Sequence, residues 1–158
     1  MTETSPLGRA ALIYAAHAWP VFPLVPLRKT PLTAHGFKDA SVDTDQILDW
    51  WGANPRANIG VVTGPVDQGG CGLDVYDADT PDAVELLKRQ VSHPKAPTMA
   101  ALSSTPRGVH LWVPASGDPR EIGIALGLDF CGVGGYVVVP PSVTGTGGYL
   151  WRQPPWNA

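Results

Sequence analysis

Apolar residues recur at helical spacing in three segments of the chain, and capping residues mark where those segments begin. In the first segment, apolar side chains repeat every three to four positions after Ser5 and Pro6, which is typical of an amphipathic helix with a capped amino terminus. Thr80 and Pro81 repeat the same signal further along the chain. The predicted helices cover residues 6–18, a segment that begins after Asp43 or Thr44, and residues 81–91.

Short apolar and β-branched runs, separated by glycine and proline, predict the strands. Pro23 has no backbone N–H to donate, so it limits the first run to a sheet edge or a bulge. The order of helices and strands predicts an α+β or α/β fold in which helices cover a mixed sheet. The predicted strands are residues 21–25, 59–63, 72–76, 98–103, 109–113 and 136–140, with a further one at 149–152.

Length and composition describe an ordinary globular chain. Its 158 residues fit a single domain over residues 1–158, and we expect a tail or linker from about residue 152. The 18 glycines and 17 prolines predict many turns between short elements. The net charge of −3 argues against a protein that coats nucleic acid by bulk electrostatics, although a local basic groove is compatible with it.

The two cysteines and the amino terminus bear on where the chain works. Cys71 and Cys131 do not make a zinc site of four Cys or His ligands, and a single disulfide between them stays open. No signal sequence is evident, and no apolar run approaches the 18 residues of a membrane-spanning helix. We therefore expect a cytoplasmic protein with no membrane partner.

Acidic residues in apolar surroundings are the first candidates for a site. Asp74 and Asp129 lie between apolar neighbours, where an unpaired carboxylate is costly to bury, and a strand-end turn is the structural alternative for Asp74. Side chains two apart on a strand share a face, so we expect Asp74 beside Tyr76, and Asp77 on the other face unless a bulge re-aims it. Asp79 is expected to complement the dipole of the next helix. Carboxylates from two strands can hold Mg²⁺ or Mn²⁺ with water and substrate phosphates.

A turn before one predicted strand gathers groups that suit phosphate. Arg107 offers a planar, charged fork, and Gly108 allows the backbone to approach closely. His110 follows at the start of an apolar run, where a structural histidine beside Trp112 is the alternative. The chain contains no G-x-x-x-x-G-K-[ST] loop, so a P-loop nucleotidase is not supported.

Taken in order, several segments resemble the bifunctional DNA primase/polymerase family, within the archaeo-eukaryotic primase superfamily. The resemblance extends from Ala11 to about Trp151. It implies an α+β fold: the primase-like catalytic core, a mixed β-sheet flanked by helices. The segments that carry it are WPVFPL at 19–24, KTPL at 29–32, HGFKDA at 35–40, WW at 50–51, NIGVVTG at 58–64 and GGYVVVPPS at 134–142.

The same resemblance implies roles for the candidate residues. Members of the family carry an acidic pair, a histidine motif and a later acid, which Asp74, His110 and Asp129 match as the expected catalytic residues. The metal ligands implied are Asp74 and Asp129, with Asp77 a conditional third. Tyr76 stands where the second acid of the pair is expected, so either a bulge brings Asp77 to the metal or the pair is broken. A phenol is a poor ligand for a hard cation, because its ordinary pKa is about 10.

The histidine motif and its neighbours are expected to bind the nucleotide. His110 would contact the phosphates, the turn before it would help to hold them, and a lysine of the amino-terminal motif would face the nucleotide. The residues expected to bind the nucleotide are Lys29, Ser104, Arg107, Gly108 and His110.

The resemblance implies a template-directed nucleotidyltransferase of DNA replication, a DNA primase and/or DNA polymerase that uses Mg²⁺ or Mn²⁺. The expected partners are nucleoside triphosphates, a single-stranded DNA template or primer–template, and a helicase domain or protein. Two alternatives stay open. One is a degenerate primase-like module that binds nucleotide or nucleic acid without catalysis, which Tyr76 and the acidic net charge favour. The other is a metal-dependent phosphohydrolase with the same ligands.

Overall fold

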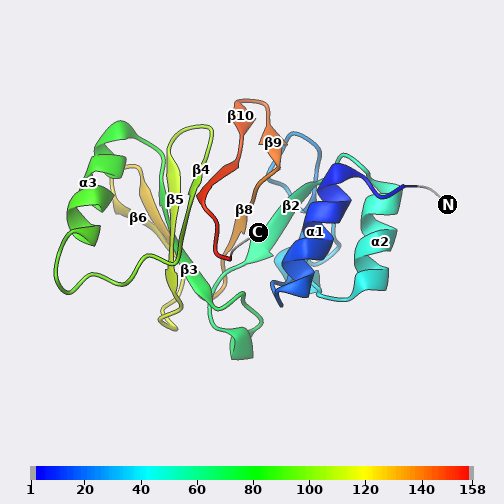
Figure 1. Cartoon of the computed structure of the whole chain (residues 1–158), viewed down its shortest axis with the longest axis horizontal. Coiled ribbons are helices and arrows are strands. Elements are labelled where there is room, and N and C mark those ends of the chain that lie inside the picture. Colours follow the sequence, from blue (N-terminus) through cyan, green and yellow to red (C-terminus); the bar gives the residue numbers. More distant parts are fainter. Residues whose placement is uncertain (1–2, 157–158) are drawn as a thin grey trace.

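The computed structural model describes residues 3–156, in which three α-helices accompany antiparallel sheets (Figure 1). The helices are α1 (Pro6–Ala16), α2 (Thr44–Ala53) and α3 (Pro81–Val91). The side chains of Ser5, Asp43 and Thr80 cap them by accepting backbone N–H groups of the first turns. The capping residues therefore begin these helices as the sequence predicts.

The larger sheet has six strands in the order β11-β4-β5-β3-β7-β6, and all of its strand pairs are antiparallel. β3 lies inside the sheet and pairs with β5 on one side and β7 on the other. The strands are β3 (Leu73–Ala78), β4 (Ala101–Ser104), β5 (Val109–Pro114), β6 (Glu121–Ala125), β7 (Leu128–Cys131) and β11 (Leu150–Gln153).

A smaller sheet holds three strands in the order β1-β2-β8, and a short hairpin joins β9 to β10. Pro23 lies in β1, which is an edge strand, as the missing N–H of proline requires. The strands are β1 (Val21–Leu24), β2 (Asn58–Val62), β8 (Tyr136–Val138), β9 (Val143–Thr144) and β10 (Gly147–Gly148). Two 3-10 turns, η1 (Gly36–Asp39) and η2 (Val66–Gln68), complete the regular structure.

The two faces of the six-stranded sheet have different coverings. Leu87 of α3 packs with Leu111 and Leu128 on one face. On the other face, Val75 and Trp112 join the main core, which includes residues of α1, α2 and the smaller sheet. Figure 1 shows α3 at one end of the molecule and α1 and α2 at the opposite end.

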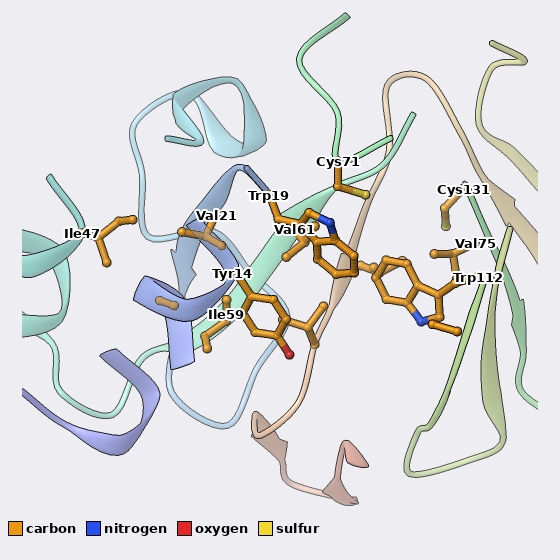
Figure 2. Close-up of a cluster of buried hydrophobic side chains, with 14 of the residues drawn as sticks. Tyr14, Trp19, Val21, Ile47, Ile59, Val61, Cys71, Val75, Trp112 and Cys131 are labelled. Carbon is orange, nitrogen blue, oxygen red and sulfur yellow. The ribbon is translucent and has the colours of Figure 1, made fainter. Parts of the chain in front are cut away.

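Aromatic side chains fill the core between the two sheets. Trp19 stacks on Tyr14 at 5.6 Å and on Trp112 at 5.1 Å, measured between ring centroids. Figure 2 shows these three rings among Val61 of β2 and Val75 of β3. This packing fixes the smaller sheet against one face of the larger one.

The α+β prediction is confirmed, with antiparallel strands rather than the mixed sheet that was expected. Cys71 and Cys131 are both buried free thiols, so the disulfide that the sequence left open does not form between them. In the tail, β11 pairs with β4, and Trp156 stacks on His17 at a centroid distance of 3.8 Å. Across residues 3–156, none of the helices has the length and apolar character to cross a membrane.

Candidate active site

A row of polar side chains crosses the face of the six-stranded sheet that packs against the smaller sheet. Asp77 on β3 lies directly opposite His110 on β5 and opposite Asp129 on β7. Ser103 on β4 lies opposite His110 and continues the row. Residues that pair directly across antiparallel strands project from the same face, so these four side chains share one surface.

Asp77 and His110 are in direct contact within this row. Nε2 of His110 lies 3.3 Å from Oδ1 of Asp77, and both side chains are largely buried, at 5% and 19% exposed. Burial raises the pKa of the Asp77 carboxyl, but the contact with His110 and the charge of Lys29 outweigh it and lower the pKa below its usual value. Asp77 is therefore ionised at neutral pH.

Asp79 makes Asp77 one member of a D-x-D pair. The two carboxyls line the same small hollow with Lys29 and Arg107. Burial and the negative charge of Asp77 raise the pKa of Asp79, while the pKa of Asp77 is lowered. Opposed shifts of this kind are characteristic of two acids that share one site. The side chain that caps α3 is that of Thr80, not of Asp79. The sequence predicted only a role at the helix dipole for Asp79, so its place in this hollow was missed.

Asp74 lies on the opposite face of the sheet, so the expectation that it converges with His110 and Asp129 is wrong. Its Oδ2 accepts hydrogen bonds from the backbone N–H and the hydroxyl of Ser116, both at 2.8 Å. The physical reason is strand alternation: Asp74 and Asp77 are an odd number of residues apart and project from opposite faces.

Tyr76 shares that opposite face, so it does not take the place of a second acid. Its ring packs against Phe130 with centroids 5.2 Å apart. The predicted strand ended at residue 76, whereas β3 continues to Ala78 and carries Asp77 between its two neighbouring strands. No bulge is needed to bring Asp77 to the site, because its register already places it there.

The row opens into a cleft of about 260 Å³ between the sheets. Lys29 and Arg120 lie at this cleft with exposed side chains and give it positive charge. Arg120 was missed in the sequence; it lies just before β6, where its backbone N–H donates to Val133 O at 2.9 Å beside Gly134, which also lines the cleft. Other residues lining the cleft are Phe37, Asp77, His110, Asp129, Cys131, Tyr136 and Tyr149.

Cys131 and Tyr149, which lie near the two acids, stay neutral at neutral pH. Burial and the charge of Asp77 raise the pKa of the Cys131 thiol to about 12, so no thiolate nucleophile is present at neutral pH. Burial, followed by the charges of Asp77 and Asp79, also raises the pKa of the Tyr149 phenol. The negative charge of the cleft therefore comes from its carboxylates.

The turn before β5 combines a functional and a structural position. Arg107 is exposed and lines the small hollow with Asp77 and Asp79. A Cβ at Gly108 would collide with the carbonyl oxygen of Ala78, so the turn rests directly on the end of β3. The backbone N–H of Gly108 donates to Thr105 Oγ1 at 3.0 Å, which leaves Arg107 as the group of this pair that faces the hollow.

The structure brings together only some of the other predicted site residues. Ser104 lies next to Ser103 on β4 and therefore projects from the other face, where its hydroxyl donates weakly to Leu150 O at 3.4 Å. Asp129 lines the cleft, and its Oδ1 accepts the N–H of Gly123 at 2.8 Å. The residues that meet around the cleft and its adjoining hollow are Lys29, Asp77, Asp79, Arg107, His110, Arg120 and Asp129.

This donor set fits a hard cation that takes further ligands from its substrate. Among residues 3–156, no group of three His, Cys, Asp or Glu side chains is arranged to hold a metal ion by itself. Mg²⁺ commonly uses one or two protein carboxylates and completes its shell with water and phosphate oxygens. Asp77 and Asp79 are the adjoining acids that suit this mode, with Asp129 across the strand from Asp77.

The fold and cleft define an α+β domain with acids, a histidine and basic groups gathered on one sheet face. Residues 11–158 match the sequence model of the amino-terminal domain of bifunctional DNA primase/polymerase, and the chain belongs to this family. At family level it is a primase/polymerase-like nucleotidyltransferase domain of DNA replication. No curated protein matches the chain.

Proposed function

We propose that the chain catalyses template-directed nucleotidyl transfer, as a DNA primase and/or DNA polymerase, with Mg²⁺ or Mn²⁺. The observation that carries the proposal is the placement of Asp77, Asp79, His110 and Asp129 around one cleft with basic groups at its edge. Nucleoside triphosphates and a single-stranded template or primer–template are the substrates that this chemistry requires. A helicase domain or protein would supply unwinding.

Asp77 and Asp79 would hold the metal, and Asp129 would add charge from the adjacent strand. When bound, the metal would neutralise phosphate charge and help to align the attacking hydroxyl with the α-phosphate. The low pKa of Asp77 keeps this carboxylate ready to bind a cation at neutral pH. Asp77 therefore needs no loss of a proton before a metal binds.

Basic and hydrogen-bonding groups would hold the triphosphate. Lys29, Arg107 and Arg120 are exposed side chains at the cleft or its adjoining hollow, and arginine forks suit phosphate oxygens. Nδ1 of His110 has no hydrogen-bond partner among residues 3–156, so the imidazole keeps one group for a phosphate while Nε2 faces Asp77.

The reaction needs no protein nucleophile. The 3′-hydroxyl of a primer or of an initiating nucleotide would form a bond to the α-phosphorus, the bond to the bridging oxygen would break, and pyrophosphate would leave. The hydroxyl proton would pass to water. Catalysis then consists of positioning and charge neutralisation by groups fixed on the sheet. The alternative of a non-catalytic module was favoured by Tyr76 and by the acidic net charge, and the position of Tyr76 on the other face removes the first of these two arguments.

Primer synthesis and primer extension test this proposal directly. With labelled nucleotides, a single-stranded template and Mn²⁺ or Mg²⁺, we expect products whose sequence follows the template and whose formation stops on chelation. Binding of nucleotide without any product, under both metals, would favour the non-catalytic module. Release of phosphate from nucleotides without a primer or product strand would favour the phosphohydrolase.

Replacing Asp79 with Asn gives a test that does not depend on activity. Because the folded protein raises the pKa of Asp79, its ionised form destabilises the fold, and this cost is present above the folded pKa and disappears as pH falls below its unfolded value. We expect Asp79→Asn to raise Tm at neutral pH in chelator, with a smaller gain in acid. Thermal unfolding should also show less stabilisation by Mn²⁺ than in the parent protein. An unchanged metal response would remove Asp79 from the proposed ligands.

A further inference from the structure

A second pocket lies on the opposite face of the six-stranded sheet from the candidate active site. Its volume is about 530 Å³, and it lies beside β3, β6 and β7. Asp74 and Tyr76 of β3 line it, whereas Asp77 of the same strand faces the cleft. The residues that give the pocket its chemistry are Asp74, Tyr76, Ser116, Asp118, Glu121 and Phe130.

The lining of this pocket carries negative charge. Asp74 is fully buried, and its Oδ1 has no hydrogen-bond partner among residues 3–156, although Oδ2 accepts two hydrogen bonds from Ser116. Asp118 and Glu121 add two exposed carboxylates, and none of the lining residues is Lys, Arg or His. A buried carboxylate oxygen without a donor is costly, so the pocket is built to meet a cationic or donor group.

A neighbouring phenol responds to the same negative charge. Burial raises the pKa of Tyr76, and the charges of Asp74 and Asp118 raise it further. The rings of Tyr76 and Phe130 lie 5.2 Å apart on the pocket wall. Aromatic faces beside carboxylates suit a guanidinium, which can stack on a ring and donate to an acid at once.

An apolar groove continues from this pocket beneath α3. It has a volume of about 350 Å³ and meets the acidic pocket at Tyr76, Val113 and Ile124. Most of its lining is apolar, and His93 and Lys95 are its basic residues. Leu87 and Val91 of α3 form its other side. An acidic pocket that runs into an apolar groove matches a segment with a basic side chain next to apolar ones.

The side chains that line this pocket and groove favour a polypeptide over nucleic acid or a metal ion as the ligand. Nucleic acid is disfavoured, because phosphates would meet Asp118 and Glu121. A metal ion is disfavoured, because no three acidic, His or Cys side chains within residues 3–156 are arranged to hold one, and no substrate phosphate belongs on this face. A polypeptide can place a basic side chain in the acidic pocket and apolar side chains in the groove.

We propose that this pocket and groove bind a partner polypeptide, whose arginine enters the acidic pocket and whose apolar side chains fill the groove. The site is independent of nucleotide chemistry, because it lies on the other face of β3. A partner bound here leaves the cleft at Asp77 open.

Peptide binding tests this proposal with defined probes. A library of acetylated hexapeptides with one fixed arginine and randomised neighbours should yield binders enriched in apolar residues. Replacing that arginine with citrulline, which is uncharged and of the same shape, should weaken binding at least ~10-fold, as expected for loss of a charge-assisted hydrogen bond. Amide NMR shifts should map to Ser116, Glu121 and α3.

The matched variants localise the effect. The double variant Asp118→Asn/Glu121→Gln removes two exposed charges and should weaken binding of the selected peptides at least ~10-fold. Asp67→Asn removes an exposed acid of η2 outside the pocket and should leave binding unchanged. The proposal is overturned if no peptide is selected, if citrulline binds equally well, or if the double variant binds like the parent. NMR shifts at this pocket with Mg²⁺ alone or with a single-stranded oligonucleotide would also overturn it.

Discussion

Replacing Asp77 with Asn is expected to reduce nucleotide incorporation by about 10²–10³-fold, the usual loss when one preorganised electrostatic group is removed from a site. Asp77 is the central residue of the polar row, with His110 on one side and Asp129 on the other. Asn has nearly the same shape but no charge, so the fold should persist while metal affinity falls. Incorporation of labelled nucleotide, measured against the concentration of Mn²⁺, separates weaker metal binding from slower chemistry.

The control for this variant is Asp67→Asn, which removes the same charge from an exposed position on η2 and should leave incorporation unchanged. Folding is checked by thermal unfolding of each variant. Full activity of Asp77→Asn, with loss of activity in a folded Asp74→Asn protein, would contradict the site that the structure gives. It would restore the assignment made from the sequence.

Replacing Trp112 with Ala is expected to destabilise the protein by about 3–5 kcal/mol, the range for large-to-small substitutions of buried aromatic residues. The Trp112 side chain is fully buried and stacks on Trp19, and its Nε1–H donates to Ser103 Oγ at 3.2 Å. Its loss would leave a cavity between the two sheets and an unpaired hydroxyl. Urea unfolding followed by circular dichroism measures the change.

Leu126→Ala is the matched control for the stability measurement. Leu126 is 96% exposed, so its truncation should change the free energy of unfolding by less than about 0.5 kcal/mol. If Trp112→Ala were equally mild, the aromatic core would not be what holds the smaller sheet against the larger one. The cleft proposed to bind nucleotide lies between those sheets, so the Trp112 variant should also bind nucleotide less tightly.

The local sequence predicted the starts of the helices well, because a capping side chain and a following proline mark them. Ser5 and Thr80 each accept a backbone N–H, and this interaction is readable from the residue type and its position before proline. Strands β6 and β7 were not predicted. The glycines around them interrupt the apolar pattern, and these strands depend on pairing with each other and with β3.

The site was predicted in its components but not in its arrangement. His110 and Asp129 could be recognised from their local motifs, whereas the choice between Asp74 and Asp77 depended on where β3 ends. That end is set by pairing with Val109 and Leu128, which are distant in sequence. Arg120 had no motif around it, and only the hydrogen bond of its backbone to Val133, next to the cleft, reveals its position.

The position of β3 gives the two adjoining acids unequal freedom to move. Asp77 lies within two ladders of hydrogen bonds, so its backbone can shift only if β5 or β7 separates from β3. Asp79 follows the last paired residue, with its N–H bonded to Gly127 O at 2.8 Å in a loop. Local unfolding of a strand end requires less free energy than opening of its centre. Amide hydrogen exchange should therefore be slower at Asp77 than at Asp79, which leaves one fixed and one adjustable carboxylate.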